Sequence, residues 1–308
     1  MKTPKPFIKW VGGKSRLFEQ LEEYLPCDLK KGRLERYVEP FLGGGAMYFS
    51  VAEKYNIKNA YLSDINKDLI LVYSIIQQKP ESLLDFLKQY QDEYDKTDQN
   101  KRSELFLSIR EHFNNQRFEI NYNKFSENWI SRAAQFIFLN KTCFNGLYRL
   151  NSKGEFNVPF GKYKTAAILD ENNILSASKI LRNAVITHAA YNDCFKNINQ
   201  DTFVYFDPPY RPISQTSNFT NYTGDGFCDE QQIELARFYR KIDKEKHAKL
   251  MLSNSDPHNV NPSDNFFENA YNGYNICKIS ASRAVNCKGN KRGKINELLI
   301  TNYKTAEL

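Results

Sequence analysis

The stretch Val204-Tyr-Phe-Asp207-Pro-Pro-Tyr210 places a carboxylate, two prolines and an aromatic ring directly after a hydrophobic run. The prolines restrict the backbone and leave the carbonyl oxygen of Pro208 free to accept a hydrogen bond from a ligand. Asp207 and this carbonyl can together accept both hydrogens of an exocyclic amine, while the ring of Tyr210 can stack on a base. The stretch therefore indicates a site for an amino group on a planar ring, although two prolines can also simply end a strand.

A second candidate site is the stretch Phe41-Leu-Gly43-Gly-Gly45, where a strand runs into glycines and then into a helix. Glycines after a strand often form only a turn, but Asp64 follows Gly43 by 21 residues, at the tip of the next expected strand. An acidic residue in that place can accept hydrogen bonds from a ribose diol. Because the spacing is not Gly-x-Gly-x-x-Gly, no pyrophosphate is required, and S-adenosylmethionine suits the pattern better than a dinucleotide.

The stretch Trp10-Val-Gly-Gly-Lys14-Ser resembles the end of a phosphate-binding P-loop. The first glycine of such a loop would fall on Ile8, whose β-branched side chain resists the positive φ angles that glycine supplies. No clear hydrophobic strand precedes it either. An ATP-hydrolysing site is therefore disfavoured, and Lys14 needs another role.

Composition and charge limit the class of protein. With 308 residues and 41% hydrophobic content, the chain can bury a large core. It contains no long apolar run and no signal-peptide pattern, so we expect a cytoplasmic protein without a membrane segment. Its six cysteines are scattered without a Cys-x-x-Cys pair, which suits reduced thiols and argues against a zinc site.

The net charge of +7 is unevenly distributed, because residues 278–296 contain six basic residues and no acidic one. A basic run is normally a solvated turn. In a chain that also carries base-binding features it becomes a candidate contact for a phosphate backbone, and we assign Lys291, Arg292 and Lys294 to that contact.

Hydrophobic runs with strand character alternate with helical patterns along much of the chain. The expected strands cover residues 36–41, 60–64, 184–189, 202–206, 248–253 and 297–302, and the expected helices cover residues 46–55, 66–77 and 229–242. We take Asp229 as the N-cap of the last helix. The alternation predicts an α/β fold with a doubly wound, mostly parallel sheet covered on both faces.

The alternation stops between residues 79 and 167, where apolar residues such as Leu83, Leu87 and Tyr94 recur at helical spacing. This segment ends in two β-prone arms around Asn151-Ser-Lys-Gly154, which predicts a hairpin over residues 144–163. We therefore predict one domain made of residues 1–78 and 168–308, interrupted by an inserted domain of residues 79–167.

Six motifs of the chain occur in the order found in the Dam-like, D12 class DNA adenine-N6 methyltransferases, which it resembles from about residue 6 to residue 303. The motifs are Trp10-Val-Gly-Gly-Lys14, Phe41-Leu-Gly-Gly-Gly45, Asp64-Ile-Asn66, Phe144-Asn-Gly-Leu-Tyr-Arg149, Phe156-Asn-Val-Pro-Phe-Gly161 and Asp207-Pro-Pro-Tyr210. The resemblance implies a Rossmann-like methyltransferase domain, with S-adenosylmethionine as cofactor and the insertion as the target-recognition domain.

The resemblance also implies methyl transfer to N6 of an adenine that has been flipped out of duplex DNA. It places Asp207, Pro208, Pro209 and Tyr210 in catalysis. It places the cofactor against Trp10, Lys14, Phe41, Gly43, Gly45, Asp64 and Asp207. The loop at residues 211–227 is then a candidate lid, or else an ordinary connection.

DNA reading is assigned by the resemblance to the hairpin and its flanks. The residues concerned are Phe144, Asn145, Leu147, Arg149, Pro159, Lys162 and Tyr163. A guanidinium at Arg149 suits guanine O6 and N7, and Leu147 and Pro159 suit a thymine methyl group. Some family members carry Tyr where this chain has Phe144 and Arg where it has Lys162. These two differences concern the recognition of the outer base pair of the target. GATC is the expected target.

Two alternatives stay open on the residues alone. An N4-cytosine DNA methyltransferase would use the same amine site, usually with Ser before Pro-Pro-Tyr, and a silent DNA-binding protein would bind duplex without consuming cofactor. We expect a monomer, encoded by a bacterium or a phage and associated with the nucleoid, that acts on double-stranded DNA without a metal ion. A cognate restriction endonuclease that acts on the same site is a candidate partner.

Overall fold

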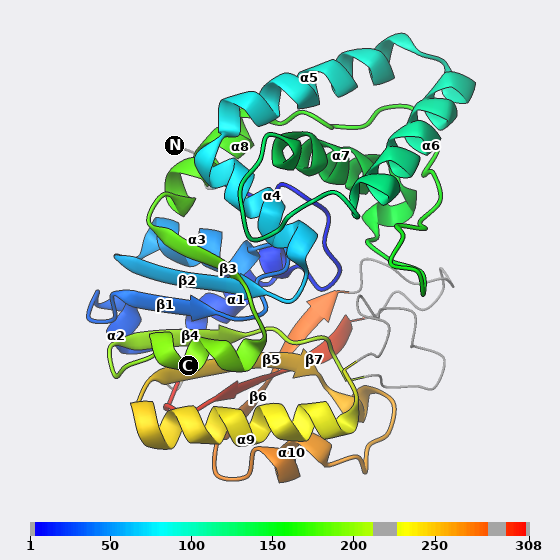
Figure 1. Ribbon diagram of the computed structural model, residues 1–308. Helices are drawn as coiled ribbons and strands as arrows, with labels where there is room; N and C mark the ends of the chain where they lie inside the picture. Colours follow the sequence, from blue (N-terminus) through cyan, green and yellow to red (C-terminus); the bar gives the residue numbers. More distant parts are fainter. Residues whose placement is uncertain (1–3, 212–226, 283–293, 306–308) are drawn as a thin grey trace.

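The computed structural model describes residues 4–211, 227–282 and 294–305 (Figure 1). Its centre is a seven-stranded sheet in the order β3-β2-β1-β4-β5-β7-β6. The strands are β1 (Arg36–Glu39), β2 (Asn59–Asp64), β3 (Ala184–His188), β4 (Thr202–Phe206), β5 (Lys249–Ser255), β6 (Asn275–Ser282) and β7 (Lys294–Thr301).

Strands β2 and β3 lie on one side of β1, and β4 and the later strands lie on its other side. Strand β1 pairs in parallel with both β2 and β4, so that Val38 lies between Tyr61 and Val204. The pairs β2–β3 and β4–β5 are also parallel, whereas β7 runs antiparallel to both β5 and β6. The carboxyl ends of β1 and β4 therefore meet at a topological switch point, where α/β folds bind ligands.

Both faces of the sheet are buried. Along β4, Phe203 and Tyr205 belong to one apolar core, and Val204 and Phe206 belong to a second. Because successive side chains of a strand point to opposite faces, these two cores lie on the two sides of the sheet. The first core contains side chains from helices α1 (Phe18–Glu23), α3 (Ala46–Lys54), α4 (Lys67–Gln78) and α8 (Glu171–Leu181). The second core contains side chains from helices α9 (Asp229–Lys246) and α10 (Phe266–Ala270).

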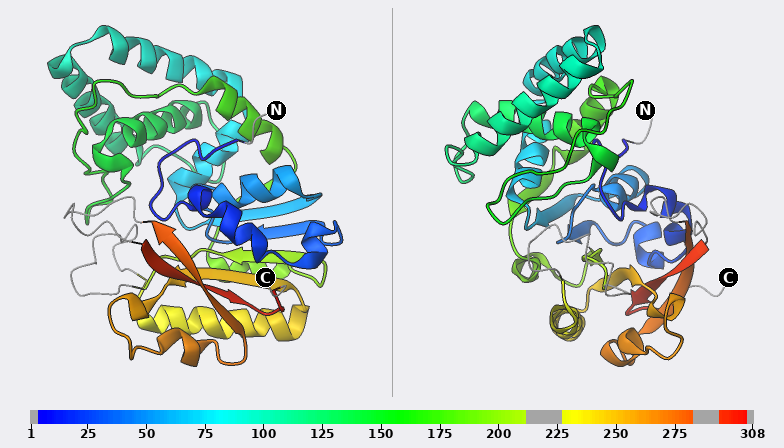
Figure 2. Two further views of the ribbon diagram at one scale, coloured as in Figure 1. Left: turned by 180° about the vertical axis from the view of Figure 1, so that it is seen from behind. Right: turned by 90° about the vertical axis from the view of Figure 1, so that its right-hand side faces the viewer.

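The insertion forms a helical layer beyond the β3 edge of the sheet (Figures 1 and 2). It consists of α5 (Pro80–Lys96), α6 (Gln99–Gln116) and α7 (Asn128–Thr142). Leu87, Phe106 and Phe138 from these helices belong to the same core as α3 and α4. The division into two domains at residues 79 and 167 stays a prediction. Within the described ranges, no helix is both long enough and apolar enough to cross a membrane.

The hairpin has two antiparallel arms held by separate bridges. Cys143 bridges Phe160, and Leu150 bridges Phe156. Between the arms, the Gly154 N–H donates to the Asn151 carbonyl oxygen over 2.9 Å, and Gly154 has a φ of 74°. The remaining short helical segments are α2 (Cys27–Lys30) and the 3-10 turns η1 (Lys14–Arg16), η2 (Phe144–Gly146), η3 (Tyr191–Asn197) and η5 (Pro257–Asn259).

The doubly wound, mostly parallel sheet is confirmed, and the six predicted strands are present with small shifts of their ends. Strand β6 was not predicted, because it lies at the sheet edge, pairs only with β7 and carries a polar sequence that includes Lys278. The N-cap prediction was wrong by one residue. Helix α9 begins at Asp229 with Cys228 at the N-cap, and the Asp229 carboxylate instead binds Arg211.

Candidate active site and nucleic-acid interface

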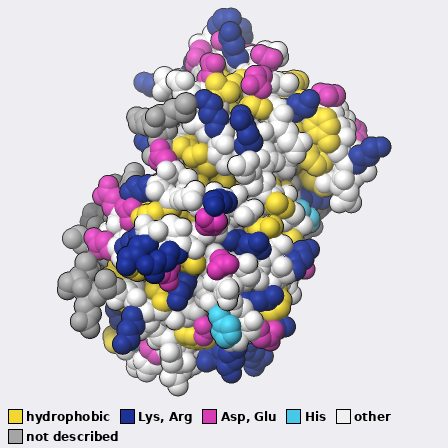
Figure 3. All heavy atoms as spheres, turned by 90° about the vertical axis from the view of Figure 1, so that its left-hand side faces the viewer, with side chains coloured by type: hydrophobic (Ala, Val, Ile, Leu, Met, Phe, Trp, Pro, Cys, Tyr) yellow, Lys and Arg dark blue, Asp and Glu magenta, His cyan; other side chains and the backbone are white. Residues whose placement is uncertain are grey.

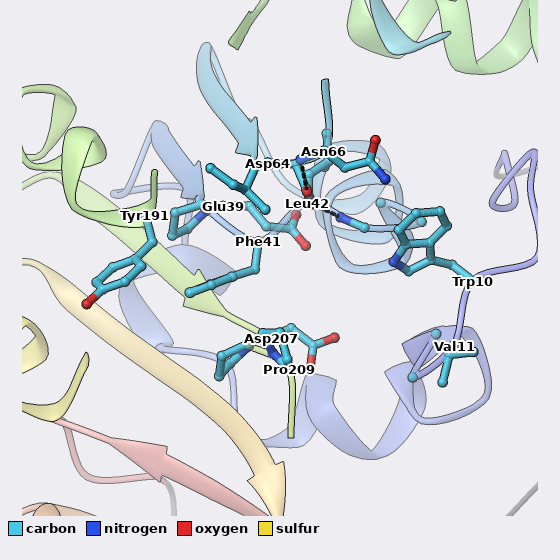
Figure 4. A pocket seen from close by; sticks show the side chains of 18 of the residues that line it. Trp10, Val11, Glu39, Phe41, Leu42, Asp64, Asn66, Tyr191, Asp207 and Pro209 are labelled. Carbon is cyan, nitrogen blue, oxygen red and sulfur yellow. Dashed lines mark hydrogen bonds between the residues drawn. The ribbon is translucent and has the colours of Figure 1, made fainter. Parts of the chain in front are cut away.

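A cavity of about 670 Å³ opens at the carboxyl ends of β1, β2 and β4. Its walls are the loops that follow these three strands, together with the N-terminal segment 10–14. Figure 4 shows Trp10 on one side, Phe41 and Tyr191 on the other, and Asp64 and Asp207 between them. All ten residues assigned to cofactor or catalysis line it: Trp10, Lys14, Phe41, Gly43, Gly45, Asp64, Asp207, Pro208, Pro209 and Tyr210.

The glycine turn after β1 depends on backbone conformations that other residues adopt poorly. Gly43 and Gly45 have φ angles of 48° and 69°. A Cβ atom on Gly43 would lie 2.9 Å from Cδ1 of Trp10, and one on Gly45 would lie 2.5 Å from the hydroxyl oxygen of Tyr73. Gly43 thus lets the indole ring of Trp10 approach the turn, and Gly45 lets the turn pack against Tyr73.

Asp64 at the end of β2 is fixed by the main chain on both of its oxygens. Its Oδ2 accepts from the Gly43 N–H and its Oδ1 from the Asn66 N–H, each over 2.9 Å. Burial raises the pKa of Asp64, and these two hydrogen bonds oppose the rise. The carboxylate is therefore held in one orientation with lone pairs left for a ligand hydroxyl.

Asp207 at the end of β4 pairs with Lys14, which comes from the other end of the sequence. The Lys14 Nζ lies 2.8 Å from Oδ1 and 3.0 Å from Oδ2 of Asp207, and it also donates to the Gly12 carbonyl oxygen over 2.8 Å. Lys14 is only 3% exposed and lies 4.7 Å from the ring centroid of Tyr210. Burial raises the pKa of Asp207, and the positive charge of Lys14 opposes this.

Glu39 is a third carboxyl group in the cavity wall and was not among the predicted site residues. It is 2% exposed, and its Oε2 accepts from the Tyr37 hydroxyl over 2.8 Å. Burial raises the pKa of Glu39 well above its usual range, and the charges of Asp207 and Asp64 add to the effect. Glu39 therefore lines the cavity as a neutral, protonated carboxyl group at neutral pH, beside the carboxyl groups of Asp64 and Asp207. An acidic residue ending the otherwise hydrophobic strand Tyr37-Val38 was the available sequence signal.

The segment that contains the two prolines lies in the cavity wall, where Asp207 and Pro208 are hydrogen-bond acceptors. Among the described residues, no hydrogen bond reaches the carbonyl oxygen of Pro208, which agrees with the expectation from sequence. The Tyr210 hydroxyl donates to Oε2 of Glu297 on β7 over 2.7 Å, and this bond holds the hydroxyl end of the ring in place. A carboxylate, a carbonyl and an aromatic face thus surround one part of the cavity.

A buried charge network joins the cavity to the insertion. Asp68 in the first turn of α4 lines the cavity and accepts from Arg132 on α7, over 2.7 Å to Nε and 3.1 Å to Nη2. The hydroxyls of Tyr122 and Tyr148 donate to the same carboxylate over 2.5 and 3.3 Å. Sequence reasoning missed this network, because its members are spread over 80 residues with no common spacing.

Tyr148 connects the hairpin to Trp10 in the cavity wall. Its ring stacks on Trp10 with centroids 5.9 Å apart and an interplanar angle of 28°. Its neighbours in the chain are Leu147 and Arg149, which sequence reasoning assigns to base reading. A residue of the cavity wall therefore lies between two residues that are assigned to base reading.

The residues assigned to DNA bases lie together on the hairpin. Phe144 is 52% exposed, and Asn145, Arg149, Pro159 and Lys162 are also exposed. Asn145 and Lys162 have φ angles of 56° and 55°, a strained conformation that is often found at functional sites. Oδ1 of Asn157 accepts from the Arg149 Nε over 2.7 Å, which orients the guanidinium.

Leu147 and Tyr163 are half-buried, and Tyr163 holds the hairpin in place. Its hydroxyl accepts from the Asn145 N–H over 3.0 Å, and its carbonyl oxygen accepts from the Tyr94 hydroxyl on α5 over 2.7 Å. Tyr163 therefore braces the strained turn at Asn145 against the helical layer.

Of the basic segment at residues 278–296, the structure describes residues 278–282 and 294–296. Lys278 lies in β6 and pairs with Oδ2 of Asp256 over 3.1 Å. Lys291 and Arg292 lie outside the described residues, as do residues 212–226 of the candidate lid, and Lys294 is described only as the first residue of β7. The face in Figure 3 shows Lys and Arg among Asp and Glu, so charge alone marks no DNA-binding surface there.

Comparison with known proteins identifies a family and several relatives of this chain. A family model described as D12 class N6 adenine-specific DNA methyltransferase matches residues 10–285. The type II methyltransferase M.MjaIII of Methanocaldococcus jannaschii is 48% identical over 97% of this chain and 99% of its own. The type II methyltransferase M1.LlaDCHI of Lactococcus lactis is 37% identical, and the DNA adenine methylase of Escherichia coli strain K12 is 31% identical; each alignment covers 97% of this chain and 95% of the relative.

Proposed function

Since the chain belongs to the D12 class N6 adenine-specific DNA methyltransferase family, we propose that its cavity binds S-adenosylmethionine and the target adenine side by side. Membership makes the chain an S-adenosylmethionine-dependent enzyme that methylates adenine N6 in DNA. It also decides against the cytosine-specific and the catalytically silent alternatives. The observation that carries the proposal is the pair of acceptors at Asp207 and Pro208 on the cavity wall.

The residues of the cavity suit this cofactor. Its volume of about 670 Å³ lies in the range of small-molecule sites. The fixed carboxylate of Asp64 can accept from a ribose diol. Gly43 lets the Trp10 ring pack against the turn after β1, where it forms an aromatic wall of the cavity. When bound, S-adenosylmethionine supplies the activated methyl group.

Asp207 and Pro208 prepare the adenine amine for reaction. The lone pair of an exocyclic amine is delocalised into the ring, which makes the amine a weak nucleophile. Hydrogen bonds from both N–H groups to the Asp207 carboxylate and the Pro208 carbonyl stabilise the positive charge that grows on N6 during methyl transfer. N6 then loses one proton and becomes neutral. Lys14 keeps Asp207 oriented, and the ring of Tyr210 stacks on the flipped base.

Target recognition falls to the hairpin, and GATC is the target that we propose. The exposure of Phe144, Asn145, Arg149 and Lys162 on the hairpin supports a role of these residues in contacting DNA. Arg149 suits the edge of a guanine. Sequencing of the methylation marks in DNA from an expressing host tests the proposal. N6-methyladenine in GATC supports it, and N6-methyladenine in another sequence refutes the target but leaves the catalytic assignment intact.

We place the enzyme in a restriction-modification system as a monomer. Two of its relatives are named type II methyltransferases. The partner would be an endonuclease that cleaves the same site when it is unmethylated. Light scattering of the purified protein tests the monomer. Co-expression with a restriction endonuclease that cleaves unmethylated GATC tests the partner, because host DNA survives only if the two enzymes share a target.

A further inference from the structure

The segment Asp207-Pro-Pro-Tyr210 belongs to no helix or strand, yet its acceptors must be placed accurately. Neither proline has an N–H, so ordinary main-chain pairing cannot hold this part of the chain. Side chains do so instead. Gln232 Nε2 donates to the Pro209 carbonyl oxygen over 3.0 Å, and the Arg211 N–H donates to Asn254 Oδ1 over 3.1 Å.

These two side chains form one buried relay. Nδ2 of Asn254 on β5 donates to Oε1 of Gln232 on α9 over 3.1 Å, and both side chains are 0% exposed. Because Oε1 of Gln232 accepts from Asn254, its nitrogen must face Pro209. Each amide therefore has a single orientation that satisfies its neighbours. Ser255 completes the relay, since its Oγ donates to the Arg211 carbonyl oxygen over 3.0 Å.

The far end of the segment is anchored by the Arg211 side chain. Its guanidinium contacts Asp229 over 2.6 and 2.9 Å and Asp264 over 2.6 Å. It also lies 4.2 Å from the ring centroid of Phe266. The chain is thus held on both sides of Tyr210, and the hydrogen bond to Pro209 leaves the adjacent Pro208 carbonyl free for the substrate.

We infer that Gln232 and Asn254 are positioning residues for methyl transfer: their relay fixes the main chain so that the Pro208 carbonyl and the Tyr210 ring face the adenine. Neither residue lines the cavity, so both act only through Pro209 and Arg211. The inference rests on the proposed amine site at Asp207 and Pro208. A displacement of about 1 Å at such a site can lower the rate roughly 100-fold.

The substitution Gln232→Glu tests the relay with almost no change of shape. One carboxylate oxygen still accepts from Asn254, but the other, when ionised, faces the Pro209 carbonyl and repels it. A protonated carboxyl can donate to Pro209 and restore the bond, and burial favours that form. We expect the single-turnover rate at pH 8.5 to fall by about 10- to 100-fold. The ratio of variant to wild-type rate should then rise about tenfold as the pH is lowered to 6.

Two further variants separate positioning from general damage. Gln232→Leu cannot donate at any pH, so its rate should stay low without recovery. Asn254→Asp forces Gln232 to turn its nitrogen toward the new carboxylate, and it should show the same recovery at low pH as Gln232→Glu. In all three variants, the dissociation constants for S-adenosylhomocysteine and for target duplex should change by less than about threefold, because no cavity residue is altered.

Gln77→Glu is the matched control. Gln77 on α4 also donates to main-chain carbonyls, over 2.7 Å to Leu181 and 2.8 Å to Ala184, but it lies outside the cavity lining. Its variant should lose stability without a change in the pH profile of the rate. The relay is refuted if Gln232→Glu keeps the wild-type rate and profile, or if its profile matches that of Gln77→Glu. An active Asp207→Asn enzyme would instead overturn the proposed amine site, whatever Gln232 does.

Discussion

Asp207→Asn probes the amine site with the smallest change of volume that the site allows. The asparagine keeps one oxygen that can accept from Lys14, but it replaces the second oxygen by an NH₂ group that opposes the adenine amine. Lys14 also retains its hydrogen bond to the Gly12 carbonyl oxygen, at 2.8 Å. The fold should therefore survive, while the transition state loses one of its two acceptors.

The expected loss follows from the number of acceptors. Removing one well-placed hydrogen bond to a developing charge lowers the rate by about 100- to 1000-fold. Since the Pro208 carbonyl still accepts from the amine, the variant should keep the part of the rate acceleration that does not depend on Asp207. The loss should appear in the single-turnover rate at saturating DNA and cofactor, while the dissociation constant for S-adenosylhomocysteine should change much less.

The assay is transfer of a labelled methyl group to a duplex, with Glu22→Gln as control. Glu22 also pairs with a lysine, at 2.7 Å from Lys54, and its exposure of 27% is close to the 21% of Asp207. It lies on α1, outside the cavity lining. The control should keep its wild-type rate. If Asp207→Asn retains more than about a third of the wild-type rate, the carboxylate is not an essential acceptor and the reasoning fails.

Three further predictions concern other parts of the site. Gly45→Ala should lower the free energy of unfolding by at least about 1–2 kcal/mol, measured with urea, because the residue has a φ of 69° and its Cβ would crowd the Tyr73 hydroxyl. Arg149→Ala should lose about 1–3 kcal/mol of discrimination at one base pair, measured with single-base variants of the duplex; equal weakening on every duplex would make Arg149 a phosphate contact. Glu39 has a raised pKa, so the folded protein retains a proton that the unfolded chain releases above about pH 4.3. Wild-type stability should therefore fall with rising pH relative to Glu39→Gln, and parallel curves would contradict the assignment.

The fold class and the ten assigned residues of the cavity wall could be predicted from the sequence alone. Strands and helices alternate with their own periods, and three of the wall motifs lie at the carboxyl ends of strands, so that parallel pairing brings Gly43, Asp64 and Asp207 to one edge of the sheet. The inserted helices and the hairpin turn at Gly154 were also legible, because helical spacing and turn residues are local signals.

Which of these groups contact one another became clear from the packing of the folded chain. Lys14 was expected to contact the cofactor, and the fold also pairs it with Asp207, 193 residues away. The Asp68–Arg132 network and the Gln232–Asn254 relay join helices and strands that no periodicity relates. Single polar residues inside apolar segments carry no local sign of their partner. Burial makes them costly unless they are paired, and only the packing of distant segments supplies the pair.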